Sequence, residues 1–502
     1  MIDVPAIVIG SGYGGAVAAL RLGEAKIDTL VLERGRRWDI AEPATNAKFA
    51  TFERPDGRAE WLNTVTRTPA YDGTPIEKYT GVLELTKLGD YMFMSGAGVG
   101  GGSLVYGGIL IQPTKRLFNQ VFPSFVRYEE MDAIYYPRVR SIIGVEPIPD
   151  DILNSEYYLG LKVLREHAVR SGFTERDSHT HPDGDSSILF PMAVDWDFVR
   201  EEISGKRVPS VIGAQFWWGN NSGAKRSLER DYLKLAEETG HVSIRPLHEV
   251  TSIAATESGA YRVSYNILLE TGRVIEGHSA TCKRLFLAAG TLVTNRLLLE
   301  ARARRGLKNL SEELGRNFGN NGDTFIYRTN LEETTNPHLG GPGALAVQNY
   351  TNSLAPCLMM RAPLPRFAQD FPHKNAIGAF VFCQTSNRGT LSWNAATDSM
   401  DLDFRPDAVA QACATSLAKR LSRSSGGDVS TPTFNITGHQ LGGACIGAVC
   451  DEYGRVRGCS GLYVVDGSLM PGSTTPTNPA FTIAAIAERC METIVATDCS
   501  HI

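Results

Sequence analysis

The start of the chain combines a short apolar run with closely spaced glycines. Residues 6–9 (Ala-Ile-Val-Ile) are typical of a buried parallel strand, and Gly10, Gly12 and Gly15 follow in the pattern G-x-G-x-x-G. In such a turn the first glycine permits the sharp bend. The second lets the backbone approach a pyrophosphate, and the third lets the next helix pack closely on the strand. This pattern predicts a dinucleotide-binding strand–turn–helix unit.

The next residues extend the same unit. A helical stretch covers 16–23, and its N-terminal amides would point at the phosphates. A second short strand, 29–32, ends at Glu33, 23 positions after Gly10, where an acceptor for a ribose 2′-hydroxyl is needed. A simple glycine-rich turn would not be accompanied by a strand, a helix, a second strand and an acidic residue at the expected spacing. We therefore expect a dinucleotide-binding site. The stretch does not separate FAD from NAD.

Composition narrows the class of protein. With 42% hydrophobic and 21% charged residues, the composition is that of a globular protein. The 502 residues are enough to form the hydrophobic cores of two or three domains. With a net charge of −5 the chain has no excess of basic residues of the kind that binds nucleic acid, so we expect no nucleic acid partner. No secretion signal precedes the first strand, and the nine cysteines include no C-x-x-C pair. We therefore expect a cytoplasmic protein with reduced thiols.

Two features of the first half concern loops and ligands. Residues 36–87 are rich in Pro, Thr and Asp and are typical of long surface loops. Residues 95–108 are glycine-rich but also hold Val99, Leu104, Val105 and Tyr106, which a flexible linker would not usually contain. We interpret 95–108 as backbone that lies against a flat ligand. The uncharged runs 91–114 and 334–360 hold too much Gly, Pro or Asn for membrane helices, so we expect no integral membrane segment.

The middle of the chain contains one stretch that we assign to a separate lobe and one that we assign to the nucleotide-binding domain. Residues 113–224 are expected to form a separate lobe that includes a helix at 156–171. His179 and His181 beside Asp183 and Asp185 resemble a metal cluster, but no further ligand spacing supports one, so we expect a solvated loop and no metal. Strands are expected at 241–244, 249–253 and 261–269, and we assign them to the nucleotide-binding domain.

Two further blocks complete the chain. Residues 285–290 form a second apolar strand that ends in glycine, and a helix is expected from Thr291 to Ala301. Strands at 378–384, 390–393 and 400–404 are expected to form an antiparallel sheet. In the C-terminal block a strand at 462–465 leads into Asp466-Gly467. A helix over 480–496 is expected, with Asn478 as its N-cap and Pro479 at its first position.

Stretches of this kind along the whole chain resemble the glucose–methanol–choline (GMC) flavoprotein oxidoreductases, and within them the bacterial cholesterol oxidases that bind FAD without a covalent bond. The matching stretches are GSGYGG from Gly10, SGAGVGGGSLVYGG from Ser95, WGNNSGAKRSL from Trp218, LFLAAGTL from Leu285, HQLGGACIG from His439 and GLYVVDGSLMPG from Gly461. They occur in the same order as in that family, so the resemblance does not depend on a single fingerprint.

The resemblance implies an α/β fold with two domains. A Rossmann-like FAD-binding domain would comprise 1–45, 225–320 and 430–502, with a flavin-contacting loop at 92–112. A substrate-binding domain would comprise 46–224 and 321–429, with a mainly antiparallel sheet covered by helices.

The resemblance also implies residue roles. His439 and Asn478 would be the catalytic pair, and Met360 and Phe434 would lie in the substrate pocket. Non-covalent FAD would be bound by Gly10, Gly12, Tyr13, Gly14, Gly15, Glu33, Arg34, Gly98, Gly101, Gly102, Ser103, Val105, Tyr106, Gly107, Val250, Ala289, Gly290, Asp466, Gly467, Asn478, Pro479 and Phe481.

The chain also departs from the cholesterol oxidase pattern. Gln440 and Ala444 alter the usual His-Pro-Leu-Gly-Gly-Cys run, and the loop 473–477 is one residue longer. Met360 falls where the resemblance places the steroid-isomerising glutamate, and Tyr106 replaces an asparagine. A thioether cannot shuttle a proton as a carboxylate does, so we expect oxidation without isomerisation.

These observations predict an enzyme that oxidises an alcohol to a carbonyl by hydride transfer to flavin N5, with O₂ or another acceptor to reoxidise the flavin. His439 suits the removal of the hydroxyl proton, because an imidazole titrates near neutral pH. The substrate is expected to be a sterol or a similar small-molecule alcohol. The alternatives are another natural-product alcohol, such as an amino sugar or a polycyclic metabolite, and a flavoprotein that only binds a ligand.

Overall fold

The first sheet is built around strand β1 (Ile2–Ile9). In the computed structural model, which describes residues 2–40, 48–68, 73–176, 183–364, 375–432 and 434–499, β1 pairs in parallel with β2 (Thr29–Leu32) and β10 (Val274–Leu287). The strand order is β7-β2-β1-β10-β9-β8, with β19 also on β10. The other strands are β7 (Val242–Arg245), β8 (His248–Ala255), β9 (Tyr261–Leu268) and β19 (Leu462–Val464). The strands expected in this sheet are confirmed.

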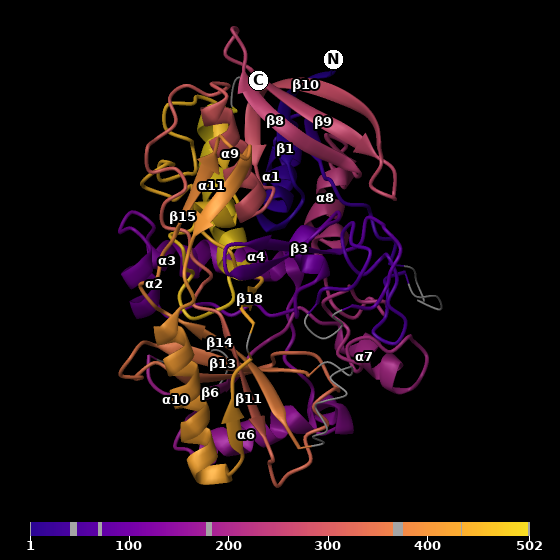
Figure 1. Cartoon of the computed structure of the whole chain (residues 1–502), viewed down its shortest axis with the longest axis vertical. Coiled ribbons are helices and arrows are strands. Elements are labelled where there is room, and N and C mark those ends of the chain that lie inside the picture. Colours follow the sequence, from indigo (N-terminus) through magenta and orange to yellow (C-terminus); the bar gives the residue numbers. More distant parts are fainter. Residues whose placement is uncertain are drawn as a thin grey trace.

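Strand β10 changes partners along its length. Its first part pairs antiparallel with β9 as far as Cys282, and its last residues, 285–287, pair in parallel with β19. Those last residues are apolar and fully buried, as a strand covered on both faces requires. The nucleotide-type sheet therefore combines the beginning, the middle and the end of the chain, as Figure 1 shows in its upper half.

Four helices cover this sheet: α1 (Tyr13–Glu24), α8 (Tyr232–Glu238), α9 (Thr291–Ala303) and α11 (Ala480–Asp498). Helix α1 packs against both α8 and α11. The fully buried carboxylate of Glu488 joins all three, because it accepts two hydrogen bonds from Arg21, at 2.7 and 2.8 Å, and one from the Tyr232 hydroxyl at 2.8 Å. A buried charge is tolerated when it is paired and hydrogen-bonded in this way.

The second sheet lies in the lower half of Figure 1. Its order is β17-β11-β14-β13-β12-β6-β5, antiparallel except between β5 and β6. Its strands are β5 (Thr174–Arg176), β6 (Ser186–Leu189), β11 (Thr324–Thr329), β12 (Leu345–Asn349), β13 (Cys357–Ala362), β14 (Ile377–Cys383) and β17 (Asp428–Ser430). Helices α6 (Leu159–Arg170) and α10 (Ala408–Ser425) pack against it, so the expected antiparallel sheet with a helical cover is confirmed.

Two segments lie differently from the sequence-based expectation. Helix α4 (Tyr136–Ile143) packs against α11, and the rings of Tyr136 and Phe481 are 4.8 Å apart, so this part of 113–224 joins the first core instead of a separate lobe. Strands β15 (Thr390–Asn394) and β16 (Ser399–Asp403) form their own two-stranded ribbon, not part of the second sheet. Leu391 of that ribbon is buried in the first core.

The remaining elements lie between the sheets or on the surface. Strands β3 (Leu83–Leu88), β4 (Tyr91–Gly96) and β18 (Ile436–Thr437) form a small sheet, so the end of the expected loop 36–87 is a strand. The short helices are α2 (Lys115–Val121), α3 (Tyr128–Glu130), α5 (Asp150–Leu153) and α7 (Trp196–Ile203).

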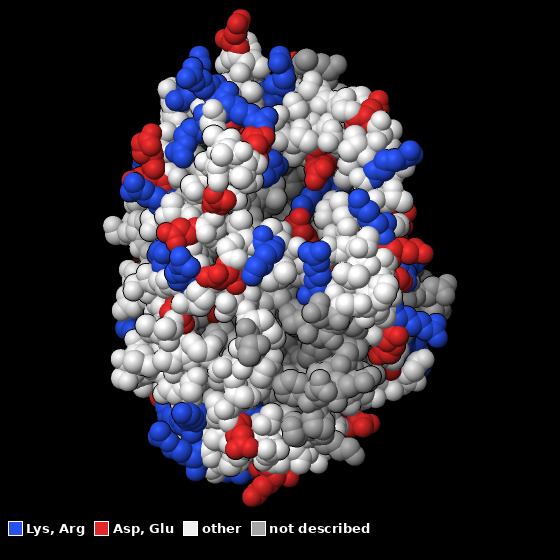
Figure 2. All heavy atoms as spheres, in the orientation of Figure 1, with Lys and Arg blue, Asp and Glu red and all other residues white. Residues whose placement is uncertain are grey.

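The surface and the thiols complete the description. Acidic and basic side chains are interspersed on the face drawn in Figure 2. All nine cysteines are free thiols, and eight of them are buried. Among the described residues, no helix combines the length and apolar character that crossing a membrane requires. His179 and His181 lie outside the described residues.

Candidate active site

A cavity of about 670 Å³ lies where the two sheets meet. From the first sheet it is lined by residues at the carboxyl ends of β1, β2 and β10, such as Gly10, Glu33 and Ala289. Ligands of open α/β sheets bind at this edge. From the second sheet it is lined by Phe325 on β11 and Met360 on β13. The cavity therefore joins a dinucleotide-type edge to the expected substrate sheet.

The glycines around the cavity fall into two groups. A Cβ added at Gly12, Gly102 or Gly290 would meet no protein atom within 4 Å, so at these positions the backbone leaves open space. A Cβ at Gly14 would lie 1.9 Å from Val465 O, so that glycine is needed for packing. Gly12, Gly102 and Gly290 line the cavity and form a cradle that a side chain would fill, which fits a closely bound nucleotide.

Glu33 ends β2 and faces the glycine turn. Its Oε2 atom accepts hydrogen bonds from the backbone N–H of Ser11 at 3.0 Å and from the Ser11 hydroxyl at 2.7 Å. Its Oε1 atom accepts from the Gly35 N–H at 2.9 Å. Burial raises the pKa of Glu33. The carboxylate is thus held at the cavity wall, at the predicted distance in sequence from the first glycine.

Asp466 joins the C-terminal strand to the second glycine corner. Its Oδ2 atom accepts hydrogen bonds from the Gly290 N–H at 2.9 Å and the Thr294 hydroxyl at 2.6 Å, and its Oδ1 atom accepts from the Ser468 N–H at 2.9 Å. Burial raises the pKa of this carboxyl group. The residue lines the cavity, as the sequence predicts, but much of its hydrogen-bonding capacity is used inside the protein.

The glycine-rich loop 95–108 also borders the cavity. Its residues 101–104 form a 3₁₀ turn, and a Cβ at Gly101 would lie 2.7 Å from the Cα of Gly12, so the loop presses against the first glycine turn. The Tyr106 hydroxyl donates to Arg226 O at 2.8 Å, and burial raises the pKa of Tyr106. The loop is thus a packed wall and not a linker.

Most of the predicted cofactor residues line the cavity. They are Gly10, Gly12, Tyr13, Gly14, Glu33, Arg34, Gly101, Gly102, Val105, Tyr106, Gly107, Val250, Ala289, Gly290, Asp466, Gly467, Asn478 and Pro479. Gly15, Gly98, Ser103 and Phe481 are not part of the lining. Ser103, for example, accepts a hydrogen bond from the Leu228 N–H at 3.0 Å, and a Cβ at Gly15 would lie 2.1 Å from Gly10 O. Gly15 and Ser103 therefore contact other parts of the protein instead of the cavity.

The two predicted pocket residues have different surroundings. Met360 is fully buried on β13, opposite Phe380 on β14, and both line the cavity. Phe434 is 40% exposed and does not line the cavity, so it is not a wall of this pocket. Most of the apolar wall was not predicted, and it also includes Phe216, Trp217, Phe325, Phe380 and Phe382. Alternation along β11 and β14 was the available signal for Phe325, Phe380 and Phe382.

His439 lies on the cavity wall beside an acidic residue that the sequence analysis missed. The Nδ1 atom of its ring is 2.9 Å from both carboxylate oxygens of Asp323. The hydroxyl of Thr437 donates to Asp323 at 2.6 Å and accepts from the backbone N–H of His439 at 3.0 Å. The ring also packs against Phe382, with 5.3 Å between ring centroids. No motif spacing connects residues 323 and 439, so only the fold brings them together.

Asn478 does not cap the last helix, contrary to the sequence-based expectation. Helix α11 begins at Ala480 with Pro479 at the N-cap position and without a side-chain cap. The amide of Asn478 instead contacts the chain just after the glycine-rich loop. Its Nδ2 atom donates to Ile109 O, and its Oδ1 atom accepts from the Ile111 N–H at 3.2 Å. These backbone groups lie outside regular strands and offer the amide better-placed partners than the helix end.

The loop before Asn478 is anchored by a buried asparagine. Asn321 accepts a hydrogen bond from the Thr474 N–H at 2.9 Å and donates to Thr477 O at 2.7 Å. Thr475 in this loop is fully buried and has φ 73°, a left-handed conformation that is unfavourable for a β-branched residue. Strain of this kind persists only where the surroundings enforce it, and it clusters at functional sites.

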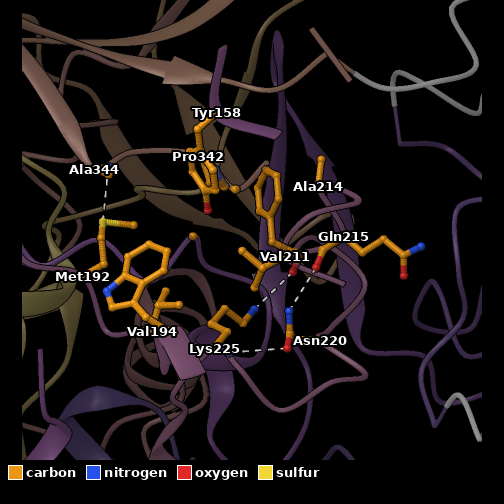
Figure 3. Close-up of a pocket in the computed structure, with 14 residues that line it drawn as sticks. Tyr158, Met192, Val194, Val211, Ala214, Gln215, Asn220, Lys225, Pro342 and Ala344 are labelled. Carbon is orange, nitrogen blue, oxygen red and sulfur yellow. Dashed lines mark hydrogen bonds between the residues drawn. The ribbon is translucent and has the colours of Figure 1, made fainter. Parts of the chain in front are cut away.

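A second, smaller cavity of about 20 Å³ lies behind the main one and shares Gly107, Phe216 and Pro342 with it. Figure 3 shows Lys225 reaching into it between Val211 and Asn220. The Nζ atom of Lys225 donates to Leu104 O at 2.7 Å and to Phe216 O at 3.3 Å, and burial lowers the pKa of Lys225 to about 7. This lysine ties the glycine-rich loop to the aromatic wall.

Comparisons with known proteins agree with this arrangement. Residues 391–487 match the family model described as GMC oxidoreductase. The chain is 27% identical over 568 aligned positions to a cholesterol oxidase of Mycobacterium tuberculosis. This alignment covers 97% of this chain and 90% of that protein. It is 24% identical to a cholesterol oxidase of Acinetobacter baumannii, covering 98% of this chain and 95% of that protein.

The fold also matches a solved structure. The crystal structure of pyridoxine 4-oxidase from Mesorbium loti superposes with a TM-score of 0.63 at 16% identity, covering 99% of this chain and all of the other. At this identity the likeness concerns the fold. GMC oxidoreductases are flavoproteins that usually bind FAD, and the glycine cradle fits such a group. These matches and the site support an FAD-dependent alcohol oxidoreductase, and the chain is similar to the GMC oxidoreductases.

Proposed function

We propose that this enzyme oxidises the hydroxyl group of an apolar, polycyclic alcohol such as a sterol to a carbonyl. The observation that carries the proposal is the character of the cavity. Its dinucleotide edge opens onto a wall of aromatic and thioether side chains, and His439, Asp323 and Asn478 are polar groups on the same cavity. An apolar wall with a few convergent polar groups suits a large apolar ligand with one hydroxyl group.

The cofactor is held by groups of the first sheet in this proposal. Gly12, Gly102 and Gly290 let backbone approach the bound dinucleotide, and Glu33 accepts from its ribose. When bound, FAD supplies the acceptor for the hydride that leaves the carbinol carbon of the substrate. We propose the cofactor domain as 1–45, 225–320 and 430–502 with the loop 92–112, and the substrate domain as 46–224 and 321–429, although α4 and β15 pack on the first core.

The proton of the substrate hydroxyl goes to His439 in this proposal, since an imidazole is the side chain best suited to proton transfer near neutral pH. Asn478 orients the substrate oxygen. Its amide nitrogen has two protons, and Ile109 O accepts one of them, so the other is left for a substrate.

We further propose that FAD is not covalently attached. A covalent bond would need a nucleophilic side chain on the loop beside the flavin, and Tyr106 is the candidate there. Its hydroxyl already donates to Arg226 O, and burial raises its pKa, which makes the phenolate unfavourable. Acid precipitation should therefore release the yellow cofactor into the supernatant, and colour that stays in the pellet would contradict the proposal.

Three observations bear on the substrate class. The relatives that cover nearly the whole chain are cholesterol oxidases, which supports a sterol-like substrate. The apolar wall favours a polycyclic metabolite over an amino sugar as the alternative, because few polar groups face a sugar's hydroxyls. Met360 places a thioether on the wall where the resemblance places a carboxylate. This difference from the cholesterol oxidases supports keeping other polycyclic alcohols as substrates in the proposal.

An anaerobic substrate panel tests the proposal. The purified flavoprotein is mixed with sterols, other polycyclic alcohols and amino sugars, and bleaching of the flavin absorbance is followed, with His439→Ala as the matched control. We expect bleaching by a polycyclic alcohol and slowing by about 10²-fold in the variant, the scale of a lost general base. Bleaching by amino sugars alone would replace the substrate class. No bleaching by any alcohol would favour a flavoprotein that only binds a ligand.

A further inference from the structure

We propose that Asp323 is a positioning residue that sets the proton of His439 on Nδ1, so that Nε2 is the atom that receives the substrate proton. This inference rests on the proposed function, in which His439 is the base. It adds a residue from β11's N-terminal edge, far from the C-terminal block in sequence, and it specifies which atom of the imidazole does the chemistry.

The hydrogen-bond geometry determines the tautomer. An ionised carboxylate only accepts hydrogen bonds, so the proton between Asp323 and Nδ1, at 2.9 Å, belongs to the ring nitrogen. A neutral imidazole carries one proton, and its Nε2 atom then has a free lone pair. Across the described parts of the chain, no protein group forms a hydrogen bond with Nε2, and His439 lines the cavity. The basic nitrogen is therefore left for a ligand.

The carboxylate is itself held in place. The Thr437 hydroxyl donates to its Oδ2 atom at 2.6 Å, and its side chain is only 8% exposed. The backbone N–H of Asp323 donates to Asn320 O at 3.1 Å, and the Nδ2 atom of Asn320 donates back to Asp323 O at 3.3 Å. A carboxylate with so little freedom can hold the ring in one orientation, and it favours the imidazolium that forms when Nε2 takes up a proton.

The same turn positions the second catalytic candidate. Asn321, two residues before Asp323, binds Thr474 and Thr477 in the strained loop that leads directly into Asn478. Residues 320–323, which we name the linking turn, therefore contact the His439 side and the Asn478 side of the site at once. A single turn of this kind keeps the base and the orienting amide in a constant relation, which catalysis requires within small tolerances.

The proton balance is simple. In the proposed oxidation the substrate O–H bond breaks and its proton goes to Nε2, the carbinol hydrogen leaves with the electron pair of its C–H bond, and a C=O bond forms. Bound FAD would accept that hydride. The proton on Nδ1 stays there throughout, and Asp323 neither gains nor loses one. The carboxylate acts only through the ring.

Tautomer measurement gives a direct test that needs no turnover. The protein has ten histidines, so uniformly ¹⁵N-histidine-labelled enzyme is recorded at alkaline pH, where an imidazole is neutral, and the His439 signals are assigned by their loss in His439→Gln. We expect the shifts of an Nδ1–H tautomer in the holoenzyme. Observation of the Nε2–H tautomer in this sample would overturn the inference without any Asp323 variant.

The matched variants test the role of Asp323. In Asp323→Asn the amide nitrogen can donate to Nδ1, so we expect a shift toward the Nε2–H tautomer and flavin reduction slower by about 10²-fold, with substrate affinity within about threefold of wild type. Asp323→Glu keeps the carboxylate and should recover part of the rate. Asn321→Gly, which tolerates φ 61°, loosens the other end of the linking turn and should leave the tautomer unchanged.

The outcomes separate the two proposals. If His439→Ala is slow while Asp323→Asn reduces flavin at the wild-type rate, the role of Asp323 is wrong and the proposed function stands. If His439→Ala itself reduces flavin normally, the base assignment fails and the inference about Asp323 fails with it, whereas the proposed function fails only if no polycyclic alcohol reduces the flavin of the wild type. A tautomer change in Asn321→Gly equal to that in Asp323→Asn would mean that general loosening of the turn, not the carboxylate, sets the proton.

Discussion

The Oδ1 atom of Asn478 accepts a hydrogen bond from the backbone N–H of Ile111 at 3.2 Å. With the bond from Nδ2 to Ile109 O, the side-chain amide pairs with the backbone just after the glycine-rich loop as a neighbouring strand would. The start of the last helix is thus tied to the loop beside the cofactor cavity. Asn478 has a structural role there in addition to its proposed contact with the substrate.

Replacing Asn478 with alanine should therefore affect both stability and rate. We expect a loss of about 1–3 kcal/mol in the free energy of unfolding, because two buried backbone groups lose their partner. We also expect flavin reduction to slow by about 10²-fold, the cost of a lost orienting donor. Denaturant unfolding and anaerobic stopped-flow absorbance measure the two effects. His439→Ala, as a control, should slow the reduction while it leaves the bonds to Ile109 and Ile111 in place.

The two groups of glycines predict different defects. In Gly12→Ala the added methyl group meets no protein atom within 4 Å but enters the cavity, so the apoprotein should unfold at the wild-type temperature while FAD affinity drops by at least about tenfold. In Gly14→Ala the methyl group would lie 1.9 Å from Val465 O, so the apoprotein itself should be destabilised, by about 1–3 kcal/mol or more. Circular dichroism melting and flavin titration distinguish them. Equal melting temperatures in both apoproteins would contradict this division.

Oxidation of a 3-hydroxy-5-ene sterol should leave the double bond unmoved. Met360 lines the cavity where the resemblance places an isomerising carboxylate, and a thioether is only a weak acceptor. Rapid quenching followed by the ultraviolet absorbance of a conjugated enone measures the outcome. Asp323 is a carboxylate on the same cavity, although His439 and Thr437 occupy its oxygens. Prompt conjugated product that disappears in Asp323→Asn would show that this residue moves the proton and that the expectation is wrong.

Stability should depend on pH through Asp231. This residue precedes α8, and burial is the main cause that raises its pKa from 3.8 to about 7. Because the folded protein holds the proton between these values and the unfolded chain releases it, the stabilisation is full below the unfolded pKa and is lost as the pH rises through the folded pKa. Wild type should therefore lose stability relative to Asp231→Asn between about pH 4 and pH 7. Urea midpoints of both proteins across this range measure it, and parallel curves would contradict it.

The sequence predicts the parts of the structure that local patterns encode. The glycine turn, Glu33 and the strand at 462–464 were found because each depends on a short run of neighbouring residues. The start of the last helix was also predicted, but the prediction of Asn478 as its N-cap was wrong. Asn478 is a good N-cap by residue type, yet backbone partners more than 360 residues away in sequence bind its amide instead.

Long-range contacts account for what the sequence analysis missed. Asp323 ends the run Asn320-Asn321-Gly322-Asp323 and looks like an ordinary turn residue, so its pairing with His439 could be seen only in the fold. Residues 113–224, which include α4, were assigned as a whole to a separate lobe, but α4 packs on the first core. An amphipathic pattern shows that one face of a helix is buried but not which element covers it. Phe434 was placed in the pocket by resemblance, and its exposure shows that this chain uses other aromatic residues there.

The change of partner along β10 has a consequence for how the protein acquires its cofactor. The strand that completes the cavity edge, β19, and the cavity residues that follow it are synthesised well after β10. Domains normally fold as units, and contacts between distant segments form slowly. A nascent chain that has not yet released β19 exposes the apolar edge of β10. We therefore expect flavin capture to follow the pairing of β19 with β10.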